Sequence, residues 1–266
     1  MGRTVPASVK EESSAMTVAP AAKAHKGWIE TAAAVALYGV YELVRGFGGS
    51  DYVAAKLHTA DIVAFERRLG LFHELGVQQA AAKVPGLPAF LGAAYITLHL
   101  FATIAFLVWV FRSRRRAFPL VRTTLVGSTA IALVIYVLYP VAPPRLTELG
   151  FADTVTNGIG LNLSSELLGA LYNPLAAVPS LHFGYSLLVG VGVGVYALAQ
   201  RRWVRLLGVT YPLFMLYTIV ATGNHFVLDA VAGAVVVAAA WFAARFLLGE
   251  AAQPQPQRQR SAVVSA

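Results

Sequence analysis

Residues 222–248 read TGNHFVLDAVAGAVVVAAAWFAARFLL, a run that is apolar almost without interruption. An α-helix of about 20 apolar residues crosses the hydrocarbon core of a bilayer, so this run predicts a transmembrane helix. Its first turns nevertheless carry His225 and Asp229. Ionisable side chains are costly at membrane depth and are usually functional there. The polar start of this run is therefore a candidate functional site.

The whole chain has the composition of an integral membrane protein. Of its 266 residues, 57% are hydrophobic and 13% are charged, and the mean hydropathy is +0.63. The apolar runs of helical length fall at about residues 28–45, 87–111, 119–140, 181–199, 204–221 and 225–248. We therefore expect an all-α, polytopic membrane helix bundle with six transmembrane helices.

The segments outside these runs are polar. Residues 1–27 lack the apolar core of a signal peptide, and we expect them to be a disordered cytoplasmic tail. Residues 249–266 are expected to be a second such tail, which leaves residues 28–248 as the six-span domain. In residues 51–86 closely spaced charges accompany apolar positions of helical period. This pattern predicts a helical segment that lies along the membrane interface.

The basic residues predict how the chain is oriented, because Lys and Arg near the ends of spans stay on the cytoplasmic side. In a six-span arrangement, one side of the membrane receives Lys23, Lys26, Arg112, Arg114, Arg115, Arg116, Arg201, Arg202, Arg205, Arg258 and Arg260. Both termini are then cytoplasmic in a multi-pass protein of the cell membrane. The interfacial segment, the loop 139–179 and the turn before the last span are extracytoplasmic.

The net charge of +8 is accounted for by this orientation and by contact with anionic lipid. No basic face is interleaved with aromatic residues, so we expect no nucleic-acid partner. The chain contains no cysteine, which excludes disulfides, thiolate metal sites and cysteine nucleophiles. The oligomeric state is not predicted by any of these patterns.

The stretch TGNHFVLD, residues 222–229, has the spacing of an activated histidine. A separation of four residues places His225 and Asp229 on one helical face. The carboxylate can then hold the imidazole in one tautomer, as the orienting acid of a nucleophile or base does. A buried His–Asp pair that only joins two helices would have the same spacing.

The stretch VPSLH, residues 178–182, predicts a helix start that binds an anion. Pro179 and the cap Ser180 leave the amides of Leu181 and His182 at the head of the fourth span. Such a start attracts phosphate, and His182 adds a titratable proton. Read alone, the stretch is equally an ordinary capped helix with an incidental histidine.

Arg145 in the stretch PPRL has a planar guanidinium that suits phosphate oxygens. An interfacial arginine that binds lipid headgroups would give the same local pattern. Arg145, the helix start at Ser180 and the two histidines together predict a phosphoryl-transfer site that uses no metal cofactor.

VPSLH and GNHFVLD resemble the second and third signature motifs of the type 2 phosphatidic acid phosphatase superfamily. The closer likeness is to the branch of the fungal inositolphosphorylceramide synthases, or inositol phosphotransferases, and it covers about residues 60–245. The resemblance implies that His225 is the nucleophile, Asp229 its orienting partner and His182 the acid that protonates the leaving oxygen. Ser180 and Arg145 would hold the phosphate of a lipid phosphate or phospholipid, through a phosphohistidine intermediate.

The chain departs from the broader family at positions that carry phosphate-binding cations. Leu138 stands where the family has a lysine, and Leu146 stands where a proline follows the first-motif arginine. Thr218 and Ile219 stand where the family has Ser-Arg. The missing cations favour a phosphodiester-like or lipid-linked headgroup over a highly charged phosphomonoester.

Other functions are open at this point. A lipid phosphate phosphohydrolase would use the same residues with water as the acceptor. A membrane transporter or proton relay would line its pathway with His99, His182, His225 and Asp229. A metal site could be built from the last three.

Four further polar residues have less certain places in the sequence. His99, four residues after Tyr95, is expected to be a hydrogen-bonded packing histidine. Glu66 and Glu74 either shape a headgroup entrance or, as we expect, lie on the wet face of the interfacial helix. Asp153, in the outer loop, either contacts a headgroup or stabilises a turn.

Overall fold

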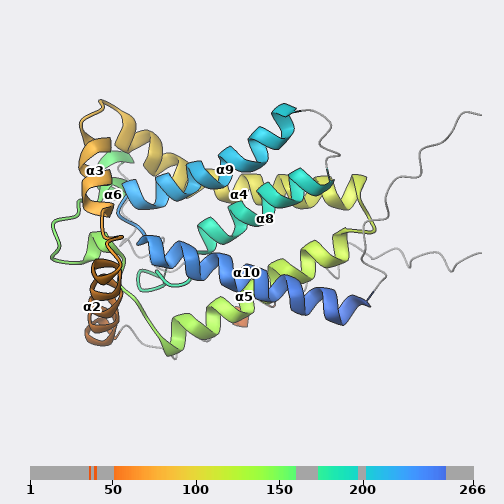
Figure 1. Cartoon of the computed structure of the whole chain (residues 1–266), viewed down its shortest axis with the longest axis horizontal. Helices are drawn as coiled ribbons and strands as arrows, with labels where there is room; N and C mark the ends of the chain where they lie inside the picture. The colour runs from red at the N-terminus through yellow and green to blue at the C-terminus, as the bar shows by residue number, and fades with distance from the viewer. Residues whose placement is uncertain (1–35, 37–38, 41–50, 160–172, 197–201, 250–266) are drawn as a thin grey trace, which may run out of the picture.

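The long apolar helices of the computed structural model run side by side along its long axis (Figure 1). The structure describes residues 36, 39–40, 51–159, 173–196 and 202–249. Most of the predicted first span, 28–45, lies outside the described residues, as do the predicted tails apart from Gly249. In the described part the secondary structure is helical except for one isolated bridge between Val141 and Ala176. The predicted all-α class is confirmed.

Four helices are long and apolar enough to cross a membrane. They are α4 (Leu87–Ser113), α5 (Phe118–Leu138), α9 (Arg202–Ala221) and α10 (Val227–Leu248). Among them lies α8 (Leu181–Tyr196), an apolar helix of 16 residues. Four of the six predicted spans are therefore confirmed as helices long enough to cross a membrane. The predicted fourth span is a shorter apolar helix over its described residues, and most of the predicted first span lies outside the described residues.

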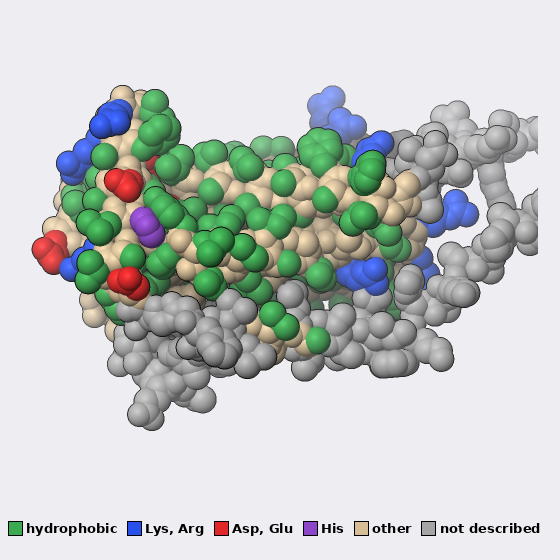
Figure 2. All heavy atoms as spheres, turned by 90° about the horizontal axis from the view of Figure 1, so that it is seen from below, with side chains coloured by type: hydrophobic (Ala, Val, Ile, Leu, Met, Phe, Trp, Pro, Cys, Tyr) green, Lys and Arg blue, Asp and Glu red, His purple; other side chains and the backbone are tan. Residues whose placement is uncertain are grey.

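The flank of the bundle is apolar, as the surface of a multi-pass membrane protein must be. Figure 2 shows charged side chains at the two ends of the displayed face, with hydrophobic and neutral groups between them. Large apolar side chains point outward from each of the four spans, for example Phe101, Val134, Leu213 and Phe242. Such a continuous exposed apolar surface requires lipid around it.

The predicted interfacial segment forms two helices, α2 (Tyr52–Arg68) and α3 (Glu74–Ala82). In Figure 1 both lie across one end of the bundle instead of along it. The short helices η1 (Pro144–Leu146) and α6 (Thr154–Ile159) belong to the loop after α5. The helix α6 packs against α4 at this same end (Figure 1). The polar segments that precede α8 and α10 are covered by these elements.

Two glycines, Gly184 and Gly233, allow the N-terminal halves of α8 and α10 to pack in close contact. A Cβ at Gly233 of α10 would collide with the backbone of Ser180, and a Cβ at Gly184 of α8 would press on Val237 and on the Gly233 carbonyl. The Ser180 amide also donates to the Asp229 carbonyl at 2.9 Å. These contacts bring two stretches that are distant in sequence to one place.

The helix α10 begins later than the apolar run predicts. Phe226 is its N-cap with an extended backbone, and Val227 is its first residue. The Asp229 carboxylate accepts the Phe226 amide at 2.9 Å, and this bond ends the helix on its N-terminal side. The prediction that His225 lies within the first turn is therefore wrong, because it lies in the turn before the helix.

Candidate active site

The α8 start has the cap that its sequence predicts. The helix begins at Leu181, and the Phe183 amide donates to Ser180 Oγ at 3.4 Å. Ser180 is fully buried. The Tyr136 hydroxyl fixes the approach by donating to the Pro179 carbonyl at 2.8 Å. The Leu181 and His182 amides lack intrahelical partners, as the first amides of any helix do.

His225 sits in a tight turn after α9. Its amide and that of Asn224 both donate to the Ile219 carbonyl at 3.1 Å. The histidine side chain is only 4% exposed. Gly223, which precedes Asn224, has φ +68°, a left-handed conformation that glycine adopts without strain. The turn therefore places the imidazole inside the protein at the end of the bundle.

The His225 ring is oriented through Nδ1. This atom lies 2.9 Å from the Ala177 carbonyl and 3.4 Å from Asp229 Oδ2. Nε2 is buried and has no hydrogen-bond partner among the described residues. With the proton on Nδ1 shared by two acceptors, the lone pair of Nε2 is left for a substrate. Asp229 is the predicted partner, but the closer acceptor is a backbone carbonyl that the motif did not reveal.

His182 is placed beside His225 by α8. The two ring centroids are 5.7 Å apart. On the α4 side, His182 stacks on Tyr95 at 4.1 Å and contacts His99 at 3.9 Å between centroids. His99 Nδ1 lies 3.1 Å from the Tyr95 carbonyl, so His99 is the hydrogen-bonded packing residue that its position predicts. The residue against which His99 packs is His182, one of the two candidate catalytic histidines.

Arg145 packs against the turn that carries His225. Its amide donates to the Gly223 carbonyl at 2.9 Å, and its Nε donates to Asn224 Oδ1 at 2.8 Å. Asp153 Oδ2 lies 3.8 Å from Nη1. Arg145 is 9% exposed, which does not fit an arginine lying among headgroups at the surface.

Asp153 and Asn173 have structural bonds of their own. Asp153 accepts the amide and the hydroxyl of Thr156, at 3.0 and 2.9 Å. Asn173 Oδ1 accepts the Leu175 amide at 3.0 Å. Asp153 therefore stabilises a turn, as one of its two predicted roles has it, and in addition it faces the Arg145 guanidinium.

Glu66 and Glu74 are not on a wet face, so that prediction is wrong. They are 0% and 1% exposed, respectively. Glu66 Oε1 accepts the Leu228 amide at 2.7 Å, and Glu74 Oε1 accepts the Val227 amide at 3.1 Å. Burial, assisted by the neighbouring Glu74 and Asp229 carboxyls and opposed by the bond from Leu228, raises the pKa of Glu66 to about 8. The helical period of α2 gave no sign of this, because the amides belong to the far end of the chain.

The positions of the missing family cations supply no charge in the structure. Leu138 is 75% exposed at the end of α5, and Ile219 is fully buried in an apolar cluster. Thr218 is buried and donates to the Phe214 carbonyl of its own helix at 2.8 Å. In the described part of the chain, no group of three His, Asp or Glu side chains is arranged to hold a metal ion.

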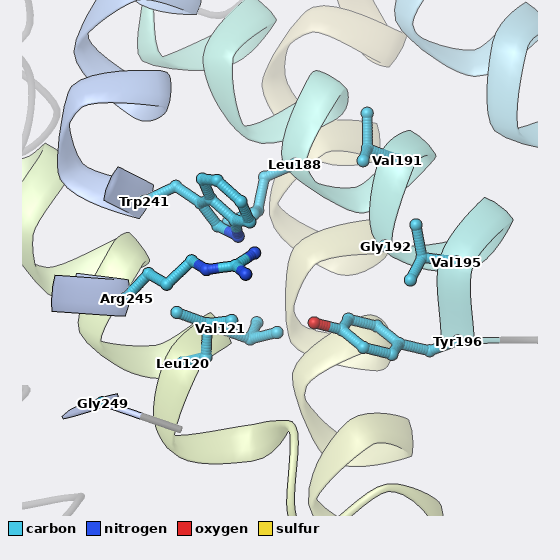
Figure 3. Close-up of a pocket in the computed structure, with 10 residues that line it drawn as sticks. All are labelled: Leu120, Val121, Leu188, Val191, Gly192, Val195, Tyr196, Trp241, Arg245 and Gly249. Carbon is cyan, nitrogen blue, oxygen red and sulfur yellow. The ribbon is translucent and has the colours of Figure 1, made fainter. Parts of the chain in front are cut away.

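A separate cavity lies at the other end of the bundle. It has a volume of about 260 Å³ and is enclosed by α5, α8 and α10. Figure 3 shows the Arg245 side chain reaching into it below Trp241, with Tyr196 across the gap. None of the residues named above for the histidine site lines it, so this cavity is not the candidate active site.

Comparison with known proteins agrees with the motifs. The PAP2 superfamily matches residues 60–243, which includes Arg145, both histidines and the two buried glutamates. No curated protein and no solved structure matches the chain. The matched region covers more than half of the sequence and runs from α2 into α10. The chain therefore belongs to the PAP2 superfamily of phosphatases and phosphotransferases and is a multi-pass membrane enzyme.

Proposed function

We propose that this enzyme is a phosphotransferase that moves a phosphoryl group or a phospho-headgroup between lipid-type substrates, in the manner of the inositol phosphotransferases. The observation that carries the proposal is the meeting of two imidazoles from distant motifs, 5.7 Å apart between centroids, with the His225 Nε2 lone pair unpartnered among the described residues. The superfamily match supports a lipid phosphate substrate.

In the first step His225 Nε2 attacks phosphorus. A nitrogen–phosphorus bond forms, the bond from phosphorus to the lipid oxygen breaks, and the electron pair of that bond leaves with the oxygen. His182 donates a proton to this oxygen, and the lipid departs as an alcohol. The positive charge that develops on the His225 ring is stabilised at Nδ1 by the Ala177 carbonyl and by Asp229.

In the second step the roles of His182 reverse. Having lost its proton, His182 removes one from the hydroxyl of the acceptor alcohol, whose oxygen attacks phosphorus. The nitrogen–phosphorus bond breaks and His225 regains its lone pair. General acid and base help of this kind contributes roughly 10² to 10⁴ in rate. We propose no cofactor, because each proton and electron pair has a residue of the chain to receive it.

The phosphate is held by the α8 start and by Arg145. The amide of Leu181 and the Ser180 hydroxyl provide donors at the helix start. The bond to Asn224 and the nearby Asp153 fix the plane of the Arg145 guanidinium. Asp153 also offsets part of its charge. Together with the uncharged side chains at 138 and 219, this supports a singly charged phosphodiester over a doubly charged phosphomonoester.

The site faces the extracytoplasmic side in this proposal. The arginines between α4 and α5 and at the start of α9 belong to the other end of the bundle from α2 and α3. This separation supports an orientation with cytoplasmic termini. Labelling of an engineered cysteine at exposed Glu148, with a reagent that does not cross membranes, tests it on intact cells.

A lipid phosphate phosphohydrolase is the second candidate, since water can replace the acceptor alcohol at the same residues. A transporter or proton relay would need no covalent step. The deciding experiment incubates the purified full chain with ³²P-labelled phosphatidic acid, a polyprenyl phosphate or phosphatidylinositol, with and without inositol, and traps the labelled protein.

We expect an acid-labile phosphohistidine and a product that contains the acceptor alcohol. His225→Ala should abolish labelling, while His73→Ala, at an exposed histidine of the interfacial region, should not. Free phosphate as the only product would favour the hydrolase. Undiminished turnover in both His225→Ala and His182→Ala would end both versions of the proposal.

A further inference from the structure

The first turn of α10 is tied to two helices from the other end of the sequence. The Val227 amide donates to Glu74 Oε1 at 3.1 Å, across a separation of 153 residues. The Leu228 amide donates to Glu66 Oε1 at 2.7 Å, across 162 residues. The first amides of a helix have no partners within it and are usually capped by a nearby Ser, Thr, Asp or Asn. In α10 two of them are capped by α2 and α3.

The two glutamates are placed to act on the amides strongly. Both side chains are buried, so their bonds to the helix start are little screened by water. Negative charge at a helix N-terminus is also favourable to the helix dipole. A carboxyl of the pair that stays ionised makes a bond about twice as strong as one between neutral groups.

The second oxygens of the pair are buried without hydrogen bonds. Neither Glu66 Oε2 nor Glu74 Oε2 has a hydrogen-bond partner among the described residues. Two adjacent carboxyls in a buried site do not both ionise readily. Burial and the neighbouring Glu74 and Asp229 carboxyls raise the pKa of Glu66 to about 8, so Glu66 keeps its proton at neutral pH.

This anchored turn leads directly to the histidine nucleophile. Phe226, between His225 and the anchored amides, is fully buried against the Phe72 and Phe151 rings, each about 6.4 Å away between centroids. Asp229 Oδ2 accepts the Phe226 amide and lies 3.4 Å from His225 Nδ1. Any shift of the first turn therefore moves both the imidazole and its acceptor.

We propose that Glu66 and Glu74 are positioning residues for the nucleophile: they clamp the first turn of α10 onto α2 and α3 and so fix His225 and Asp229 in their reacting geometry. Besides Glu74, the titratable group that acts on Glu66 is Asp229 on α10, which lies 3.4 Å from His225 Nδ1. This role rests on the proposed function, since it assumes that His225 is the nucleophile.

The test compares Glu66→Ala, Glu66→Gln, Glu74→Ala and Glu74→Gln with the wild-type full chain. Glutamine keeps an oxygen for the backbone amide, whereas alanine removes it. We expect each alanine variant to lose about 10²-fold in kcat with little change in KM, because a displacement of about 1 Å at a reacting atom has that effect. Each glutamine variant should recover at least about tenfold of this loss.

The measurements are single-turnover labelling of His225 from ³²P-labelled phosphatidic acid and phosphatidylinositol, the kcat and KM of turnover, and the thermal unfolding midpoint. The matched control is Glu148→Ala, because the Glu148 side chain is 91% exposed and pairs with Lys56 at the surface of the described part of the chain. We expect this variant to label at the wild-type rate.

Three results would overturn the inference: wild-type kcat in both alanine variants, a loss confined to KM, or glutamine variants as slow as the alanine variants. If an alanine variant does not fold, the kcat values of the two glutamine variants and of the combined Glu66→Gln/Glu74→Gln variant still test the inference. Failure of the proposed function is distinguishable, because labelling would then persist in His225→Ala whatever the glutamate variants do.

Discussion

The two histidine-bearing helix starts of this enzyme, those of α8 and α10, are capped in opposite ways. The α8 start is capped by its own Ser180, which leaves amides of the first turn for an anion. The α10 start has amides filled by carboxylates from α2, α3 and its own Asp229. A phosphate would meet free amides at α8 but negative charge at α10. In the proposed mechanism the α8 start therefore receives the substrate, and the turn before α10 presents the nucleophile.

The largest effect that would test this division is expected from His182→Ala. Loss of the acid should slow transfer from lipid substrates by roughly 10² to 10⁴. Nitrophenolate leaves from a nitrophenyl phosphodiester without needing a proton, so His182→Ala should retain most of its first-turnover rate of nitrophenolate release, while His225→Ala should lose the first step on both substrate types. Single-turnover rates of leaving-group release on the two substrate types measure the difference, because the second step still needs His182 as a base. Equal losses of the two variants on the activated ester would remove the distinction between the starts.

A smaller effect is expected from Ser180→Ala at the α8 start. The cap accepts the Phe183 amide, so its loss should lower the free energy of unfolding by about 1 kcal/mol. Loss of one hydroxyl donor to a charged phosphate should reduce kcat/KM by about tenfold. Thermal unfolding and initial rates give the two numbers, with the exposed Thr97→Ala as a control within α4. A kcat/KM loss as large as that of His225→Ala would show that the serine does more than cap and bind.

An effect on stability alone is expected in the pH dependence of unfolding at the α10 start. Because the pKa of Glu66 is raised from 4.5 to about 8, the folded protein holds its proton more tightly than the unfolded chain does. This stabilisation is fully present below about pH 4.5 and is lost as the pH rises to about 8. In Glu66→Gln this part of the decline should disappear. Unfolding midpoints measured across that range check it, and parallel curves for the two proteins would contradict it.

The parts of the fold that depend on neighbouring residues could be predicted from the sequence. The four spans follow from the length and apolar composition of their own segments, and the α8 start follows from Pro179 and Ser180. The motifs likewise placed His182 and His225 in one site, and the structure brings their rings together.

The parts of the fold that depend on contacts between distant residues could not be predicted from the sequence. Nothing near Glu66 in the sequence indicates that the Leu228 amide will be its partner. The local pattern therefore predicts that Glu66 is exposed to water, which is wrong. The Ala177 carbonyl that orients His225 is a backbone atom, which no residue pattern identifies. The start of α10 was placed two residues early for a related reason, because a periodic apolar run does not show where a side-chain cap ends a helix.

The depth at which His225 lies has a consequence for the fate of the phosphorylated enzyme. Its Nε2 atom is buried, and the whole side chain is 4% exposed. A phosphohistidine formed there is shielded from the bulk solvent, which would otherwise compete with any alcohol by sheer concentration. In the proposed mechanism the lifetime of this intermediate depends on which acceptor can reach the buried Nε2 atom, so the choice between transfer and hydrolysis becomes a matter of access instead of intrinsic reactivity.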